Sequence, residues 1–197
     1  MQQRRYKKSE ASKRALLKAA HELIIEKGFQ KTSIKEIVQA SGLSVGSFYH
    51  HFKSKDDMLN EAFLEFDDQL TKEAFMRYDA MDALDAIKAV LLDQTKYTEA
   101  TGSKLMSEYY RALLQHENRG AVSPRRAYYQ AVQTYVKKAQ LLGLLCTDHS
   151  SSSITTYLIK CVRGTLVDWC LHDGSYKASK KVASELDSYL LPFLAHG

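Results

Sequence analysis

Residues 32–59 read TSIKEIVQASGLSVGSFYHHFKSKDDML, and this stretch predicts two short helices joined by a tight turn. In the first segment, Ile34, Ile37 and Val38 recur at the spacing of one helical face, and a Thr or Ser before them can cap the helix. Gly42 then supplies the positive φ that ends a helix. The stretch therefore indicates a helical fold with a sharp turn near its start.

The second segment begins with a small polar residue and repeats the helical spacing. Ser44 can cap it, and Val45, Phe48, Tyr49 and Phe52 lie at helical intervals, with Phe48 and Phe52 expected in the core. Two short helices joined by a few residues around Gly are typical of the helix-turn-helix, which places its second helix in the major groove of DNA.

Positive charge is concentrated in the same part of the chain. Residues 1–55 contain 12 Lys and Arg against 4 Glu, a net charge of +8, whereas the remaining residues carry −3. A cationic segment that also contains the reading motif indicates nucleic-acid binding rather than a solvated basic surface.

These residues resemble the DNA-binding signature of the TetR/AcrR family of bacterial transcriptional repressors. The most specific part is Tyr49-His50-His51-Phe52-Lys53-Ser54-Lys55, and the resemblance covers only about the first 60 residues. The other matching positions are Gly28, Phe29, Thr32, Ile37, Ala40, Gly42, Ser44, Gly46, Phe48 and Leu59. The resemblance implies a ligand-responsive regulator, a repressor that binds a pseudo-palindromic operator as a homodimer and is released by a small molecule.

The whole chain of 197 residues is predicted to be all-α, because Pro is scarce and helical periodicity runs throughout. About nine helices are expected: three in a helix-turn-helix DNA-binding domain (residues 1–56) and the others in a helical ligand-binding and dimerisation domain (residues 57–197). The later helices are expected over residues 54–77, 82–100, 104–116, 124–143, 150–172 and 177–191.

The second helix of the motif lacks Arg, Asn and Gln, so bidentate base contacts are not available from it. The Ser44 and Ser47 hydroxyls can bind base edges or phosphates, and Gly46 permits a close approach of the backbone. Val45 suits either a thymine methyl or the core.

The remaining DNA contacts, to phosphates and to one base, are assigned to residues around the base-contacting positions of the second helix. Six residues are predicted phosphate contacts, two of them at the start of the first helix, where free N–H groups favour an anion: Thr32, Ser33, Tyr49, His50, Lys53 and Lys55. Lys35 is the best candidate for a direct guanine contact, a role that the family resemblance also implies.

A small-molecule pocket beyond residue 57 is implied by the resemblance, and the sequence gives hints about its lining. Tyrosines gather here, and as a group they suggest an aromatic, mostly apolar cavity for an apolar or aromatic effector. For any single Tyr, an ordinary place in the core or an interface is the favoured interpretation. The candidate lining residues are Tyr109, Tyr110, Leu113, Tyr128, Tyr129, Val132, Tyr157 and Trp169.

The segment 150–172 is apolar around more than half of its helical cylinder, so two of its faces must be buried. One face can pack on its own domain and the other on a second copy, unless the helix is central to a monomer. The resemblance implies a four-helix dimer seam that includes the last helix. The candidate interface residues are Leu158, Val162, Gly164, Leu166, Leu186 and Leu190.

Enzymatic and metal-binding alternatives find little support in the sequence. Gly42–Gly46 matches the G-x-S-x-G nucleophile elbow, but a helix precedes it where that motif needs a strand. We predict no catalytic residue, no metal site and no cofactor.

Cysteine usage and hydropathy indicate the compartment. Three cysteines without a close pair fit a reducing cytoplasm, and no apolar run reaches membrane-spanning length. Two competing hypotheses remain: an enzyme with a helical N-terminal domain, and a helix-turn-helix protein whose second half only dimerises or binds a protein.

Overall fold

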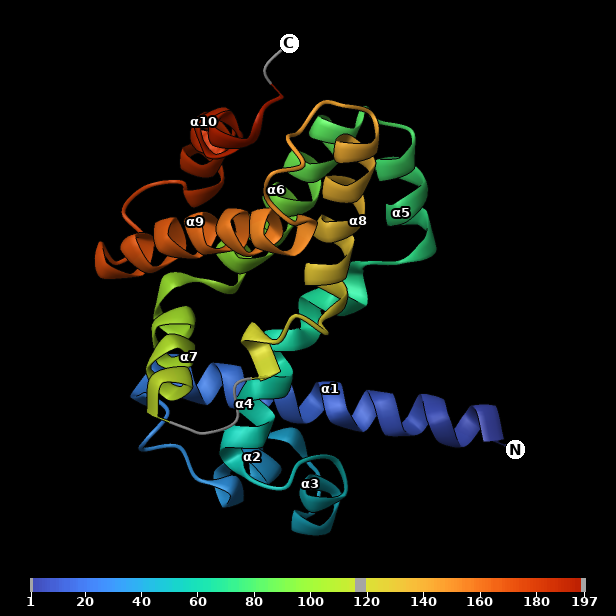
Figure 1. Ribbon diagram of the computed structural model, residues 1–197. Coiled ribbons are helices and arrows are strands. Elements are labelled where there is room, and N and C mark those ends of the chain that lie inside the picture. Colours follow the sequence, from blue (N-terminus) through green and yellow to red (C-terminus); the bar gives the residue numbers. More distant parts are fainter. Residues whose placement is uncertain (1, 116–119, 196–197) are drawn as a thin grey trace. The chain divides into compact units, whose positions relative to one another are not determined.

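The computed structural model describes residues 2–115 and 120–195, and the all-α prediction is confirmed there (Figure 1). No helix among these residues is long and apolar enough to cross a membrane. The described residues form ten α-helices and no strand: α1 (Gln2–Lys27), α2 (Ile34–Ser41), α3 (Val45–His51), α4 (Lys55–Leu64), α5 (Lys72–Asp79), α6 (Ala83–Thr101), α7 (Ser103–Gln115), α8 (Ala127–Leu141), α9 (Ser151–Leu171) and α10 (Ala178–Leu190). Three 3-10 helices accompany them: η1 (Glu65–Gln69), η2 (Gly120–Val122) and η3 (Leu191–Phe193).

The chain divides into two compact units. The first unit comprises residues 1–63 and 107–119, and the second comprises residues 64–106 and 120–197. In the first unit α1 packs against both α2 and α3 (Figure 1). The core of this unit includes the fully buried side chains of Leu16, Ala20, Ile37 and Phe48, which come from all three helices.

The second unit is built around α6. This helix packs against α8 and α10, and α9 packs against α8 and α10 in turn. The side chains of Ile87, Leu91, Val132 and Leu158 are fully buried at these contacts between helices. Apolar positions at helical spacing on each of these segments therefore meet in one core.

The predicted single helix over residues 54–77 is wrong. Helix α4 ends at Leu64, η1 follows, and α5 begins after Thr71, whose Oγ1 accepts the N–H of Ala74 at 3.3 Å. Residues 2–115 and 120–195 therefore contain one α-helix more than the nine expected.

A carboxylate in η1 accounts for the break and for a second difference. Asp67 binds Arg126 at 2.8 Å and accepts the N–H of Ala127 at 3.1 Å. Asp67 thus accepts hydrogen bonds from backbone N–H groups that have no partner within the helix at the start of α8. Helix α8 begins at Ala127 and not at Pro124 as expected. The continuous helical pattern over residues 54–77 gives no sign of this partner some 60 residues away.

Candidate nucleic-acid interface

The turn between α2 and α3 is fixed by two caps. Gly42 ends α2 with a φ of +68°, a left-handed conformation that favours glycine, and the N–H of Leu43 donates to the Val38 carbonyl at 2.9 Å. Ser44 begins α3, and its Oγ accepts the N–H of Ser47 at 3.1 Å. These bonds determine where α3 starts relative to α2.

Helix α3 has one buried face and one exposed face. Phe48 is fully buried, and its ring centroid lies 5.4 Å from that of Phe52, which is also buried. On the other face, Val45 is 48% exposed and Tyr49 is 56% exposed. The sequence allows Val45 to lie either in the core or at the DNA surface. The structure places its side chain outside the core.

Most of the residues predicted to contact DNA lie on the surface of the first unit. They come from the start of α2, from α3 with its N-cap, and from Lys53 in the loop after α3. The exposed members are Ser33, Lys35, Ser44, Val45, Gly46, Tyr49, His50 and Lys53, and Ser47 is half-buried. Such a surface offers hydroxyls, cations and accessible backbone, which are the groups that protein–DNA interfaces use.

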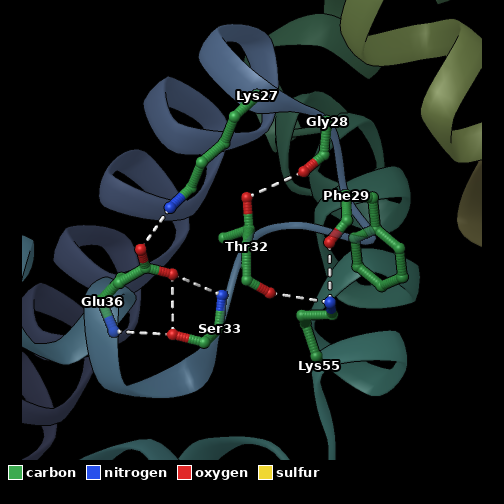
Figure 2. A network of polar contacts seen from close by, with 7 residues as sticks. All are labelled: Lys27, Gly28, Phe29, Thr32, Ser33, Glu36 and Lys55. Atoms are coloured by element: carbon green, nitrogen blue, oxygen red, sulfur yellow. Dashed lines mark hydrogen bonds and ion pairs between the residues drawn. The ribbon is translucent and has the colours of Figure 1, made fainter.

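Thr32 and Lys55 have a different environment from the other predicted contacts. Thr32 is 1% exposed, and its hydroxyl donates to the Gly28 carbonyl at 2.9 Å. The Lys55 ammonium donates to the carbonyls of Phe29 and Thr32, both at 2.7 Å (Figure 2). Both side chains therefore bind the protein's own backbone in this structure.

The first turn of α2 is held by a reciprocal cap and an ion pair (Figure 2). Ser33 Oγ accepts the N–H of Glu36 at 3.3 Å, and the Glu36 carboxylate accepts the N–H of Ser33 at 2.9 Å. Lys27, at the end of α1, forms an ion pair with the same carboxylate. Its hydrogen bond is the main cause that lowers the pKa of Glu36 to about 2, and the bonds to Ser33 add to it.

The predicted pocket residues on α7 belong to the first unit. Tyr109 is buried, with its Oη 2.8 Å from Nε2 of His21, whereas Tyr110 and Leu113 are half-buried. Burial lowers the pKa of His21 from its ordinary value of 6.5 to about 4. Tyr109 is thus a structural partner of α1.

The His21 environment predicts how stability depends on pH. Between pH 6.5 and 4 the unfolded chain binds a proton at His21 that the folded chain does not, so stability is lost as pH falls through this window. The contribution amounts to about 3 kcal/mol at most. We expect His21→Gln to lose less stability than the parent between pH 7 and pH 4.5 in urea unfolding. An equal loss in both proteins would contradict this assignment.

The other predicted pocket residues lie in the second unit but do not gather in one described cavity. Tyr128, Tyr129 and Val132 are buried on α8. On α9, Tyr157 is 40% exposed, and Trp169 is buried with its Nε1–H bonded to the Tyr176 carbonyl at 2.9 Å. A distribution of tyrosines along a sequence does not say which of them line one space.

A groove of about 430 Å³ lies elsewhere in the second unit, among η1, α5 and α6. Its lining combines three aromatic rings with charged and polar side chains: Phe66, Gln69, Glu73, Ala74, Arg77, Tyr78, Asp93 and Tyr97. Asp93 forms an ion pair with Arg77 and accepts the Tyr78 hydroxyl at 2.8 Å. Sequence reasoning missed this groove because it placed Phe66 and Arg77 on one continuous helix.

Of the candidate interface residues, five are buried within the second unit and one, Gly164, is exposed on its surface. Leu158, Val162 and Leu166 are at most 2% exposed within the single chain, and Leu186 and Leu190 are at most 3% exposed. Gly164 is exposed, and a Cβ added there would meet no atom within 4 Å.

The exposed face of α9 contains a continuous stripe. Its members recur at intervals of three or four residues, which is the spacing of one helical face. We define this α9 stripe as Tyr157, Lys160, Gly164, Asp168 and Leu171, all of which are exposed. A helix that contacts a second copy through this face would use the α9 stripe and not the buried leucines.

Comparison with known proteins relates the first unit to one family. The profile of "Bacterial regulatory proteins, tetR family" matches residues 16–62. The HTH-type transcriptional repressor KstR2 of Rhodococcus jostii (strain RHA1) is 33% identical over 103 residues, which cover 43% of this chain and 50% of that protein. The chain thus spans about half the length of the curated relatives it matches.

Solved structures share the fold of nearly the whole chain. TylP, a TetR regulator from Streptomyces fradiae, superposes with a TM-score of 0.70 at 19% identity, covering 96% of this chain and 82% of that one. FadR from Thermus thermophilus, a TetR-family transcriptional repressor in complex with lauroyl-CoA, gives 0.69 at 19% identity, covering 94% and 96%. At these identities the comparison concerns the fold alone.

Proposed function

We propose that the chain is a ligand-responsive transcriptional repressor of the tetR family of bacterial regulatory proteins, whose profile matches residues 16–62. It binds a pseudo-palindromic operator in double-stranded DNA as a homodimer, acts in the cytoplasm and is released by a small molecule. Residues 1–56 form the DNA-binding domain, and residues 57–197 form the ligand-binding and dimerisation domain.

The exposed face of α3 is the observation that carries the DNA-binding proposal. Phe48 and Phe52 anchor the helix, so its opposite face presents Ser44, Val45 and Tyr49 without a large structural change. With no Arg, Asn or Gln in α3, specificity rests on hydroxyl and methyl contacts there and on Lys35 from α2.

The proposal is tested by capturing genomic DNA fragments with the purified protein and measuring their retardation in gels at low and physiological salt. A regulator retains a small set of fragments that share an inverted repeat, at salt concentrations where unrelated duplexes are released. Failure to retard any fragment at low ionic strength would remove the basis of the proposed function.

Lys35→Ala is expected to relax the preference at one base position of each half-site. The exposed ammonium lies in the first turn of α2, beside the cap that fixes this helix. A lost base contact costs about 1–3 kcal/mol of discrimination. Binding of the captured operator and of its single-base variants measures this effect, with Lys53→Ala as the control for a phosphate contact. Equal losses on specific and unrelated DNA would show that Lys35 does not read a base.

The groove among η1, α5 and α6 is the proposed effector site. Its rings suit an apolar body, whereas Gln69, Glu73 and Arg77 suit a polar group. Since a protein of the same fold is known in complex with lauroyl-CoA, acyl-CoA esters are the first compounds to test. Release of the captured fragment by lauroyl-CoA, but not by CoA or dodecanoate alone, would support this effector class.

The α9 stripe is the proposed dimer interface. Tyr157 and Leu171 supply apolar area, and Gly164 leaves room for the close approach of a second helix. This assignment retains Gly164 from the sequence prediction and places the seam on the opposite face of α9 from Leu158, Val162 and Leu166.

A further inference from the structure

The turn between α1 and α2 is held by side chains from two other helices of the first unit. The N–H of Phe29 donates to Glu108 Oε2 of α7 at 3.1 Å, and the carbonyl of Phe29 accepts the Lys55 ammonium of α4 at 2.7 Å. Both polar groups of the Phe29 residue are therefore satisfied by long-range partners. Residues 28–32 form no regular helix, so these bonds supply what a helical ladder would otherwise provide.

The Lys55 ammonium is occupied from three directions. It donates to the Phe29 and Thr32 carbonyls, and it lies 4.2 Å from the centroid of the Phe29 ring (Figure 2). Burial lowers its pKa below the ordinary value. An ammonium has three N–H donors, and two of them are used here within the protein. Only the third donor could bind a phosphate while these contacts are kept.

The position of Thr32 links these contacts to the DNA-reading helices. Lys55 binds the carbonyl of Thr32, and the next residue, Ser33, is the N-cap of α2. The Thr32 side chain is itself anchored to Gly28. The direction in which the chain enters α2 is thus set at Thr32, and the direction of α2 in turn sets the place of Lys35.

We propose that Lys55 is a positioning residue of the DNA-binding unit and not a phosphate contact. Its ammonium fixes the α1–α2 turn, with Glu108 as the partner on the other side of the Phe29 residue. The inference rests on the proposed DNA-binding function and reassigns one residue of the predicted contact surface. Lys53, two residues earlier and exposed, keeps its predicted phosphate contact.

The dependence of binding on salt distinguishes the two roles. Each phosphate contact contributes about 0.9 to the slope of log K against log salt concentration on duplex DNA, so loss of one contact makes that slope shallower. A positioning residue affects the fit to the operator and leaves the number of phosphate contacts unchanged. The experiment compares Lys55→Met with the matched variant Lys53→Met on the captured operator and on an unrelated duplex.

We expect Lys55→Met to weaken operator binding about tenfold or more, with an unchanged salt slope and a nonspecific affinity within about twofold of the parent. Lys53→Met is expected to weaken binding to both duplexes alike and to reduce the slope by about 0.9. The proposal is overturned if Lys55→Met behaves as Lys53→Met is expected to behave. If the parent protein itself binds neither duplex, the proposed function fails instead.

A measurement on the unaltered protein covers the case in which Lys55→Met does not fold. In ¹⁵N spectra of lysine ammonium groups, the protected Lys55 signal should appear without DNA and keep its chemical shift when the operator is added. The exposed Lys53 ammonium should become visible or shift only in the complex. A Lys55 signal that appears or moves only on binding the phosphate backbone would contradict the positioning role.

Discussion

Phe48→Ala is expected to lower the free energy of unfolding by about 3–5 kcal/mol, which is a large fraction of the stability of a domain of this size. The ring is fully buried between the helices of the first unit and contacts Phe52 and Tyr49. Alanine leaves a cavity that short helices fixed by caps at both ends cannot close. Urea unfolding followed by circular dichroism measures the change.

Tyr49→Ala provides the matched control for Phe48→Ala. Tyr49 is adjacent in sequence, also aromatic and on the same helix, but it is 56% exposed. The free energy of unfolding of the Tyr49→Ala protein should therefore differ from that of the parent by no more than about 1 kcal/mol, while DNA binding weakens. Comparable destabilisation by the two variants would mean that α3 does not present the face assigned to it here.

Gly164→Arg is expected to convert the proposed dimer to a monomer and to weaken operator binding on the order of 100-fold or more. Two linked reading units bind adjacent half-sites at a high effective concentration, and a monomer loses this advantage. A Cβ added at Gly164 meets no atom of its own chain within 4 Å, and Arg favours a helix more than Gly does. The single chain should therefore fold as before, and the change is confined to the contact between copies.

Sedimentation and gel retardation together test this second result. The introduced charge is positive and would favour DNA, so a loss of affinity cannot arise from repulsion of phosphates. Ala100→Arg, at an exposed position of α6, makes the same kind of change away from the α9 stripe and should remain dimeric. A Gly164→Arg protein that still sediments as a dimer would exclude the α9 stripe as the interface.

The local elements of the DNA-binding unit follow from the sequence because their causes are local. Ser33 and Ser44 cap the helices that follow them, Gly42 adopts the left-handed turn, and the apolar spacing places Phe48 in the core. Each of these effects acts over five residues or fewer, a distance that sequence patterns describe well.

The features that the sequence does not reveal depend on partners far away in the chain. The sequence predicts a phosphate contact for Lys55 because the carbonyls that its ammonium binds lie more than 20 residues earlier in the chain. Helix α9 is apolar on two sides, so its pattern could not say whether Leu158 or Tyr157 faces inward. The groove depends in the same way on the break after α4, which changes the direction of the chain between Phe66 and Arg77.

The ion pair between Asp67 and Arg126 restricts which substitutions these two positions can accept during evolution. The two side chains are only 19% and 7% exposed, and the carboxylate also serves the backbone at the start of α8. Loss of either charge alone leaves the other buried without its counter-ion, which is costly, whereas a joint replacement need not be. Descendants of this chain should therefore inherit positions 67 and 126 as a pair, each mutation tolerated only in the background of the other.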